Sequence, residues 1–165
     1  MAQLNLEFVG LKSLEGHVTV DGKFIKLKKV NQKYVCNIET TQPQAEVVIY
    51  QSHSYTGKHW LLLNLFYFLL SVFGLFDVRH GKRCLVQDAR FKIDVAQDVN
   101  LIIRRENFVD GGAFVRTETT APVETICNQQ YYDKVGKKRA AVMKKVKLAV
   151  AVLAVIAATV VVVML

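Results

Sequence analysis

The chain has 165 residues, a formal net charge of +8 and three cysteines. Seven of its cations lie in residues 134–147, which contain no acidic residue, so the rest of the chain carries fifteen basic and fourteen acidic residues. This near-neutral body argues against a general nucleic-acid binder, whose basic residues are spread over a folded face. Cys36, Cys84 and Cys127 are odd in number and widely spaced, which supports neither a disulfide framework nor a metal site. We expect Cys36 and Cys84 to be small buried hydrophobes.

The first fifty residues read as short strands. Apolar residues alternate from Leu4 to Phe8 and predict a first strand. Asp21-Gly22 predicts a two-residue hairpin turn, because this pair accepts the positive φ angles that such a turn needs. Asn31-Gln32 predicts a second tight turn, and 46–51 a further strand. If both turns form, one face of one sheet carries Val18, Val20, Ile25, Leu27, Cys36 and Ile38.

An apolar insertion, residues 59–78, interrupts the strands. From Trp60 to Phe76 it has seventeen residues without a charge, with basic residues on both flanks. A full membrane span of about 25 Å and a buried core helix are two interpretations. The third is an insertion that enters the bilayer and returns on the same side, and we favour it because a full span would separate the strands on either side. Its candidate membrane-insertion stripe, facing the domain or the C-terminal tail, is Asn64, Tyr67, Ser71 and Gly74.

Strands resume after the insertion. Residues 83–87, 90–95, 100–105 and 113–119 have strand patterns, and Asp110-Gly111-Gly112 has hairpin-loop chemistry. The sequence therefore predicts a mainly β fold over residues 1–130, an antiparallel β-sandwich of about nine short strands. A small barrel is the alternative.

The C-terminal part predicts a membrane anchor. Residues 148–165 are eighteen residues without a charge, and as a helix they would be about 27 Å long, close to the roughly 30 Å hydrocarbon core of a bilayer. Residues 131–147 are predicted to be a basic juxtamembrane helix that keeps the β-domain in the cytoplasm. We expect no signal peptide, because Met1–Gly10 has no basic segment before an apolar run. The candidate contacts to anionic lipid headgroups are Lys134, Lys137, Lys138, Arg139, Lys144, Lys145 and Lys147.

No catalytic motif is found. The sequence has no phosphate-binding loop, dinucleotide fingerprint or zinc-protease motif, so we expect no enzyme, cofactor, metal or small-molecule substrate. His53 and His59 have no carboxylate nearby in sequence and are interpreted, with Tyr55 and Trp60, as residues of a membrane–water boundary.

The function that these features indicate is binding at a membrane. We expect a membrane-anchored, non-enzymatic β-domain at the cytoplasmic face of the lipid bilayer, which binds a protein partner or a second copy of itself or assembles a complex. One alternative is a peripheral lipid-headgroup-recognition module that also uses the basic loop 79–83. The other is an enzyme of unknown class.

Overall fold

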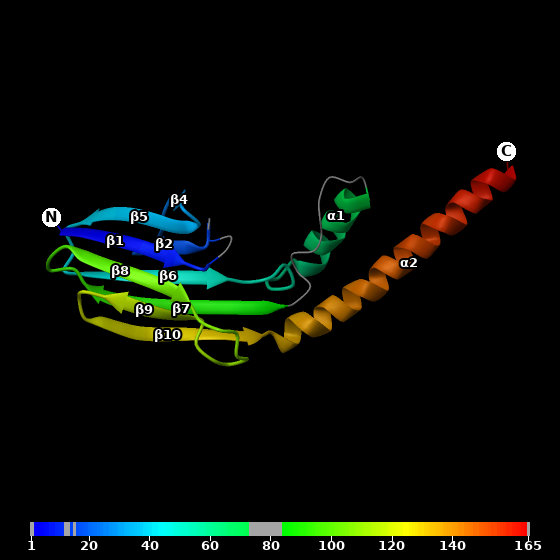
Figure 1. Ribbon diagram of the computed structural model, residues 1–165. Coiled ribbons are helices and arrows are strands. Elements are labelled where there is room, and N and C mark those ends of the chain that lie inside the picture. The colour runs from blue at the N-terminus through cyan, green and yellow to red at the C-terminus, as the bar shows by residue number, and fades with distance from the viewer. Residues whose placement is uncertain (1, 12–13, 15, 73–83, 165) are drawn as a thin grey trace. The chain divides into compact units, whose positions relative to one another are not determined.

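The computed structural model describes residues 2–11, 14, 16–72 and 84–164. The chain divides into two compact units. Residues 1–51 and 86–131 form the first, the β-unit, and residues 52–85 and 132–165 form the second, the helical unit, which contains both helices (Figure 1).

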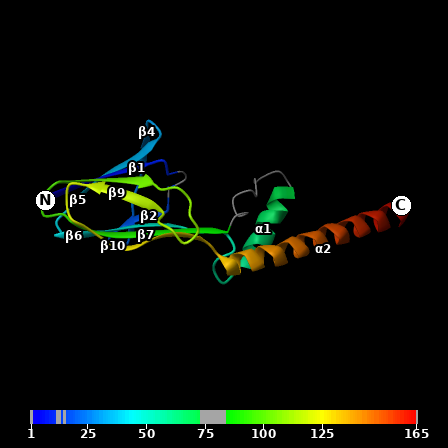
Figure 2. The ribbon, with the colours of Figure 1, turned by 60° about the horizontal axis from the view of Figure 1, so that its bottom comes forward.

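The strands of the described residues form two five-stranded sheets, which Figure 2 shows as two layers. The first sheet has the order β4-β5-β1-β8-β9 and contains β1 (Ala2–Val9), β4 (Lys28–Val30), β5 (Lys33–Thr40), β8 (Val99–Arg105) and β9 (Val115–Thr119). The second has the order β10-β7-β6-β2-β3 and contains β2 (Val18–Val20), β3 (Lys23–Phe24), β6 (Gln44–Gln51), β7 (Leu85–Asp94) and β10 (Val123–Tyr132).

Alternating side chains of both sheets form one core cluster. In β1, the side chains of Leu4, Leu6 and Phe8 are buried while those between them are not, and Val47 and Ile49 follow the same period of two in β6. The alternation that predicted these strands is therefore the pattern that fills the core, and the prediction of a mainly β chain is confirmed.

Both predicted two-residue turns are present. Asp21 and Gly22 have φ angles of 49° and 74° and bring Val20 opposite Lys23, while residues 31–32, also with positive φ, join β4 to β5. The prediction that the two hairpins extend one sheet is wrong, because the chain changes sheets between β3 and β4. The six predicted apolar residues still face a common core, three of them buried and three partly buried.

Other differences come from long-range pairing and from polar strands. β1 pairs in parallel with β8, with Leu4 opposite Val99, so the sheets are not purely antiparallel as predicted. Residues 83–87 and 90–95 were predicted as separate strands, but Leu85–Asp94 is continuous, and Asp88 and Arg90 pair on its surface. No strand was predicted at β10, whose only fully buried side chain is that of Gln130, and its last two residues were expected to be helical.

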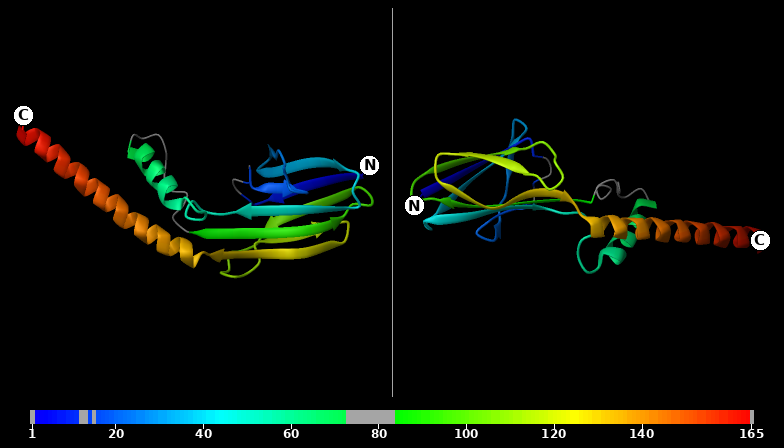
Figure 3. Two further views of the ribbon diagram at one scale, coloured as in Figure 1. Left: turned by 180° about the vertical axis from the view of Figure 1, so that it is seen from behind. Right: turned by 90° about the horizontal axis from the view of Figure 1, so that it is seen from below.

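The helical unit contains α1 (Trp60–Val72) and α2 (Lys134–Met164), which contact each other (Figure 3). The basic residues and the apolar tail belong to one continuous helix, which begins when Asp133 Oδ1 accepts a hydrogen bond from the N–H of Val135 at 2.8 Å. Among the described residues, α2 alone is long and apolar enough to cross a membrane, and none of its apolar window is buried. Gly74, the rest of the predicted insertion beyond Val72 and the loop 79–83 lie outside the described residues.

Candidate functional site

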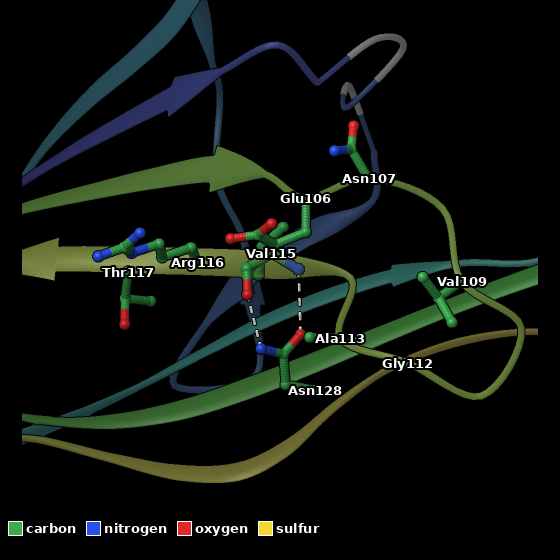
Figure 4. Close-up of a pocket in the computed structure, with 9 residues that line it drawn as sticks. All are labelled: Glu106, Asn107, Val109, Gly112, Ala113, Val115, Arg116, Thr117 and Asn128. Carbon is green, nitrogen blue, oxygen red and sulfur yellow. Dashed lines mark hydrogen bonds between the residues drawn. The ribbon is translucent and has the colours of Figure 1, made fainter.

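The β-unit has an open groove beside β9, the last strand of the first sheet. Figure 4 shows the groove between β9, the loop that precedes it and β10; its volume is about 550 Å³. Glu106 and Arg116 line it together with the exposed side chain of Val109, and neither charged group forms an ion pair with a described residue. The groove therefore offers one negative charge, one positive charge and an apolar surface to a partner.

Two amide side chains of β10 hold the loop that forms a wall of the groove. Asn128 Oδ1 accepts hydrogen bonds from the N–H groups of Phe114 and Val115 at 2.9 and 3.1 Å, and Asn128 Nδ2 donates to the Val115 carbonyl at 2.6 Å. Figure 4 shows the two bonds between Asn128 and Val115. Gln130 is fully buried and donates to two loop carbonyls at 3.0 and 2.7 Å. The amides thus replace the backbone partners that another strand would supply.

Beyond Asn128, the outer edge of β9 is open. Because Asn128 binds both backbone groups of Val115, these groups point away from β8. In an antiparallel pair the direction alternates with each residue, so the N–H and C=O groups of Thr117 and Thr119 also point outward. No described strand pairs with this edge. It is a template on which an extended segment could add as a further strand.

In the helical unit, Arg139 joins α2 to the segment before α1. Its guanidinium donates to the carbonyl of Tyr55 at 2.8 Å and to that of Gly57 at 3.3 Å, and it lies 5.5 Å from the ring centre of Trp60. These contacts use the planar shape and several donors of the guanidinium group. Arg139 was predicted to contact lipid headgroups, but in the structure its charge is directed at the protein's own carbonyls.

The other predicted headgroup residues separate into two groups. Lys147 is half-buried, and its ammonium lies 5.2 Å from the ring centre of Phe68 in α1. Five lysines are exposed and fall within an arc of about 120° of the helix surface, opposite buried Gly136 and Met143. This exposed lysine face consists of Lys134, Lys137, Lys138, Lys144 and Lys145. Of the seven predicted cations, these five have the geometry to meet an anionic surface.

A buried histidine lies where α2 begins. His53 Nδ1 accepts a hydrogen bond from the N–H of Tyr55 at 3.2 Å, which places the ring proton on Nε2, 3.2 Å from Asp133 Oδ2. The geometry of this contact is not that of a hydrogen bond, so Nε2 is buried without a hydrogen-bond partner among the described residues. A β-carbon on Gly136 would overlap this imidazole. His53 therefore has a carboxylate beside it in space that its sequence neighbours did not indicate, while its place at a membrane–water boundary stays a prediction.

Cys84 lies near the same carboxylate. The Cys84 carbonyl accepts a hydrogen bond from the Asp133 N–H at 2.8 Å. Burial raises the pKa of the Cys84 thiol, the negative charge of Asp133 raises it further, and Lys137 lowers it. A nucleophilic cysteine requires a lowered pKa, so these surroundings oppose thiolate chemistry although a histidine and a carboxylate are close. In accordance with the prediction of a small buried hydrophobe, Cys84 is almost entirely buried.

Two residues of the predicted membrane-insertion stripe, Asn64 and Ser71, form hydrogen bonds within the helical unit. Asn64 is buried, accepts a hydrogen bond from Ser54 Oγ at 2.9 Å, and donates to the carbonyls of Ser54 and Trp60 at 2.9 and 2.7 Å. Ser71 donates to the Phe68 carbonyl within α1. Asn64 therefore faces the segment before α1.

Sequence reasoning missed Asn128, Gln130 and Asp133. Asp133 had a readable signal, since an aspartate directly before a helical run is a typical N-cap. The two amides had none, because their importance depends on the loop that folds against them.

Comparisons of the chain with family models, with curated proteins and with solved structures found no match.

Proposed function

We propose that this protein is a membrane-anchored, non-enzymatic binding module. In this proposal α2 crosses the bilayer, and the basic residues before its apolar part hold the β-unit, a β-sandwich, at the cytoplasmic face. The support for the anchor is an 18-residue window of α2 that is apolar and has no buried residue. In water so large an exposed apolar surface would be unfavourable, whereas lipid would cover it.

The partner in this proposal is an extended protein segment that adds to the edge of β9. The observation that carries this role is the outward direction of the backbone groups at Thr117 and Thr119 beside the groove. Backbone hydrogen bonds would supply affinity, while Glu106 and Arg116 would select a segment with complementary charges.

Photocrosslinking in native membranes tests the partner surface. A photoreactive residue in place of Val109, in the groove, should give a discrete adduct, and one in place of Glu39, exposed on β5, should not. Thr117→Pro removes an outward N–H that β8 does not use and should abolish the adduct without unfolding the sheet. If the adduct persists with Thr117→Pro, or forms equally from Glu39, the strand-addition proposal is wrong.

The exposed lysine face supports a second candidate function, the recognition of anionic lipid headgroups. Its five charges share one side of α2, and each cation near an anionic surface contributes about 1 kcal/mol. The two candidates differ in their response to salt. Enrichment of anionic lipid around the protein should fall as ionic strength rises, because exposed charges are screened, whereas the adduct from the groove should change little.

A further inference from the structure

α1 exposes a large apolar surface. Leu62 and Phe66 are 69% and 55% exposed, and Leu69 is also exposed. α1 has 13 residues and is about 20 Å long, too short to cross the roughly 30 Å hydrocarbon core of a bilayer. The described helix is therefore not a complete span by itself. Because so much exposed apolar surface is unfavourable in water, we expect lipid or a partner to cover it.

Both flanks of α1 are attached to the first turns of α2. Before α1, the carbonyls of Tyr55 and Gly57 bind Arg139; after it, the carbonyl of Cys84 binds the N–H of Asp133. Asp133 and Arg139 lie at the same end of α2. If α2 crosses a membrane, the chain enters and leaves the α1 region on one side of it.

Two contacts give the direction and the register of α1 relative to α2. Trp60 contacts Arg139 and Phe68 contacts Lys147, so the contacts are eight residues apart on both helices. The helices therefore run in the same direction, as Figures 1 and 3 also show. By this register Val72 lies level with Ala151, a short distance into the apolar part of α2.

This register indicates how deep the pair lies. If the hydrocarbon began at Leu148, almost all of α1 would lie outside it. If Trp60 and Arg139 instead mark the outer boundary of the headgroups, α2 from Arg139 to Met164 is about 38 Å long, close to the roughly 40–45 Å of a bilayer with its headgroups. The hydrocarbon then begins near residue 64 of α1, and Val72 lies about 12 Å deeper, short of the midplane at about 15 Å.

The polar groups of this region suit that depth. Asn64 forms three hydrogen bonds within the helical unit, and Ser71 donates to a carbonyl of its own helix. At this depth Lys144 and Lys145 would lie within about 3 Å of the hydrocarbon boundary and Lys147 about 6 Å inside it, depths from which a lysine side chain extends back to the headgroups. Trp60 takes the interfacial position that tryptophan prefers.

We infer that α1 is a half-membrane helix, embedded beside α2 in the single leaflet that α2 enters, with lipid acyl chains covering Leu62, Phe66 and Leu69. Lipid is favoured over a protein partner because α1 packs beside α2, and the exposed apolar part of α2 is long enough to cross a bilayer. The inference rests on the proposed membrane anchor.

The sole tryptophan makes the depth measurable in the full-length protein. The protein is placed in phosphatidylcholine–phosphatidylglycerol vesicles that contain lipids with spin labels either near the carbonyl group or near the methyl end of the acyl chain. Trp60 should be quenched mainly by the shallow label. In Trp60→Phe/Leu69→Trp, about five residues deeper than the hydrocarbon boundary, emission should shift to the blue, quenching by the deep label should rise relative to quenching by the shallow label, and aqueous acrylamide should lose its effect.

Two matched variants separate this inference from the anchor on which it rests. Trp60→Phe/Phe24→Trp reports an exposed site of the β-unit and should respond to acrylamide alone, while Trp60→Phe/Leu153→Trp reports the apolar part of α2 and should respond to the deep label. If residue 69 behaves like residue 24 while residue 153 is deep, the half-membrane helix is wrong and the anchor stands. If residue 153 also responds only to acrylamide, the anchor itself is wrong. Trp60→Phe/Phe66→Trp repeats the measurement should the residue-69 variant fail to fold.

Discussion

Gly136→Ala is expected to destabilise the helical unit, against the usual effect of this change in a helix. In an exposed helix interior alanine is more favourable than glycine by about 1 kcal/mol. At Gly136, however, the new methyl group would overlap the imidazole of His53 and lie 2.8 Å from Asp133 Oδ2. Overpacking of a filled site costs about 1–3 kcal/mol, so the net loss should reach about 2 kcal/mol.

Urea titration in mild detergent, followed by the emission of Trp60, measures this change, because Trp60 contacts Arg139 within the same unit. Ala141→Gly, on the exposed side of α2, is the control for helix propensity alone and should lower the free energy of unfolding by about 1 kcal/mol. In the double variant His53→Ala/Gly136→Ala the methyl group has room, so the two changes should couple by more than about 0.5 kcal/mol. Additive effects, or a stabilising Gly136→Ala, would refute the reasoning.

Three further outcomes are expected. Asn128→Ala removes three hydrogen bonds and should cost about 1–3 kcal/mol, seen as faster amide hydrogen exchange at Phe114 and Val115; unchanged exchange contradicts the role of this amide. Asp133→Asn keeps a helix cap but removes a charge that raises the pKa of the Cys84 thiol, so more thiolate should form and alkylation should be faster; Cys36, whose pKa is raised by burial alone, is the reference and should not change. Glutamine in place of one lysine of the exposed lysine face, Lys138, should reduce the enrichment of anionic lipid around the protein, whereas glutamine at the half-buried Lys147 should not; because each variant loses one charge, equal effects would show that total charge, not the face, matters.

The groove and the buried histidine show why part of the candidate site could not be predicted. Asn128 and Gln130 stand in a polar strand, and nothing in their neighbours indicates that a loop ending at Phe114 folds against them. His53 follows β6 and Asp133 follows β10, eighty residues later. The two side chains meet only because these two segments pack together in the folded chain. The spacing of residues in the sequence does not predict such contacts, because they depend on the pairing of strands that are distant in the sequence.

By itself, the sequence determined the local features of this protein: the alternation that buries Leu4, Leu6 and Phe8, the two tight turns, and an apolar helix that follows a basic segment. These follow from the preferences of neighbouring residues for backbone angles and for water or apolar surroundings. Only the tertiary structure decided that β1 lies in parallel beside β8, that the two early hairpins belong to different sheets, and that Arg139 and Lys147 hold α1 while five other lysines face outward. The physical reason is that a charge or a strand edge acquires its partner only when distant segments pack together.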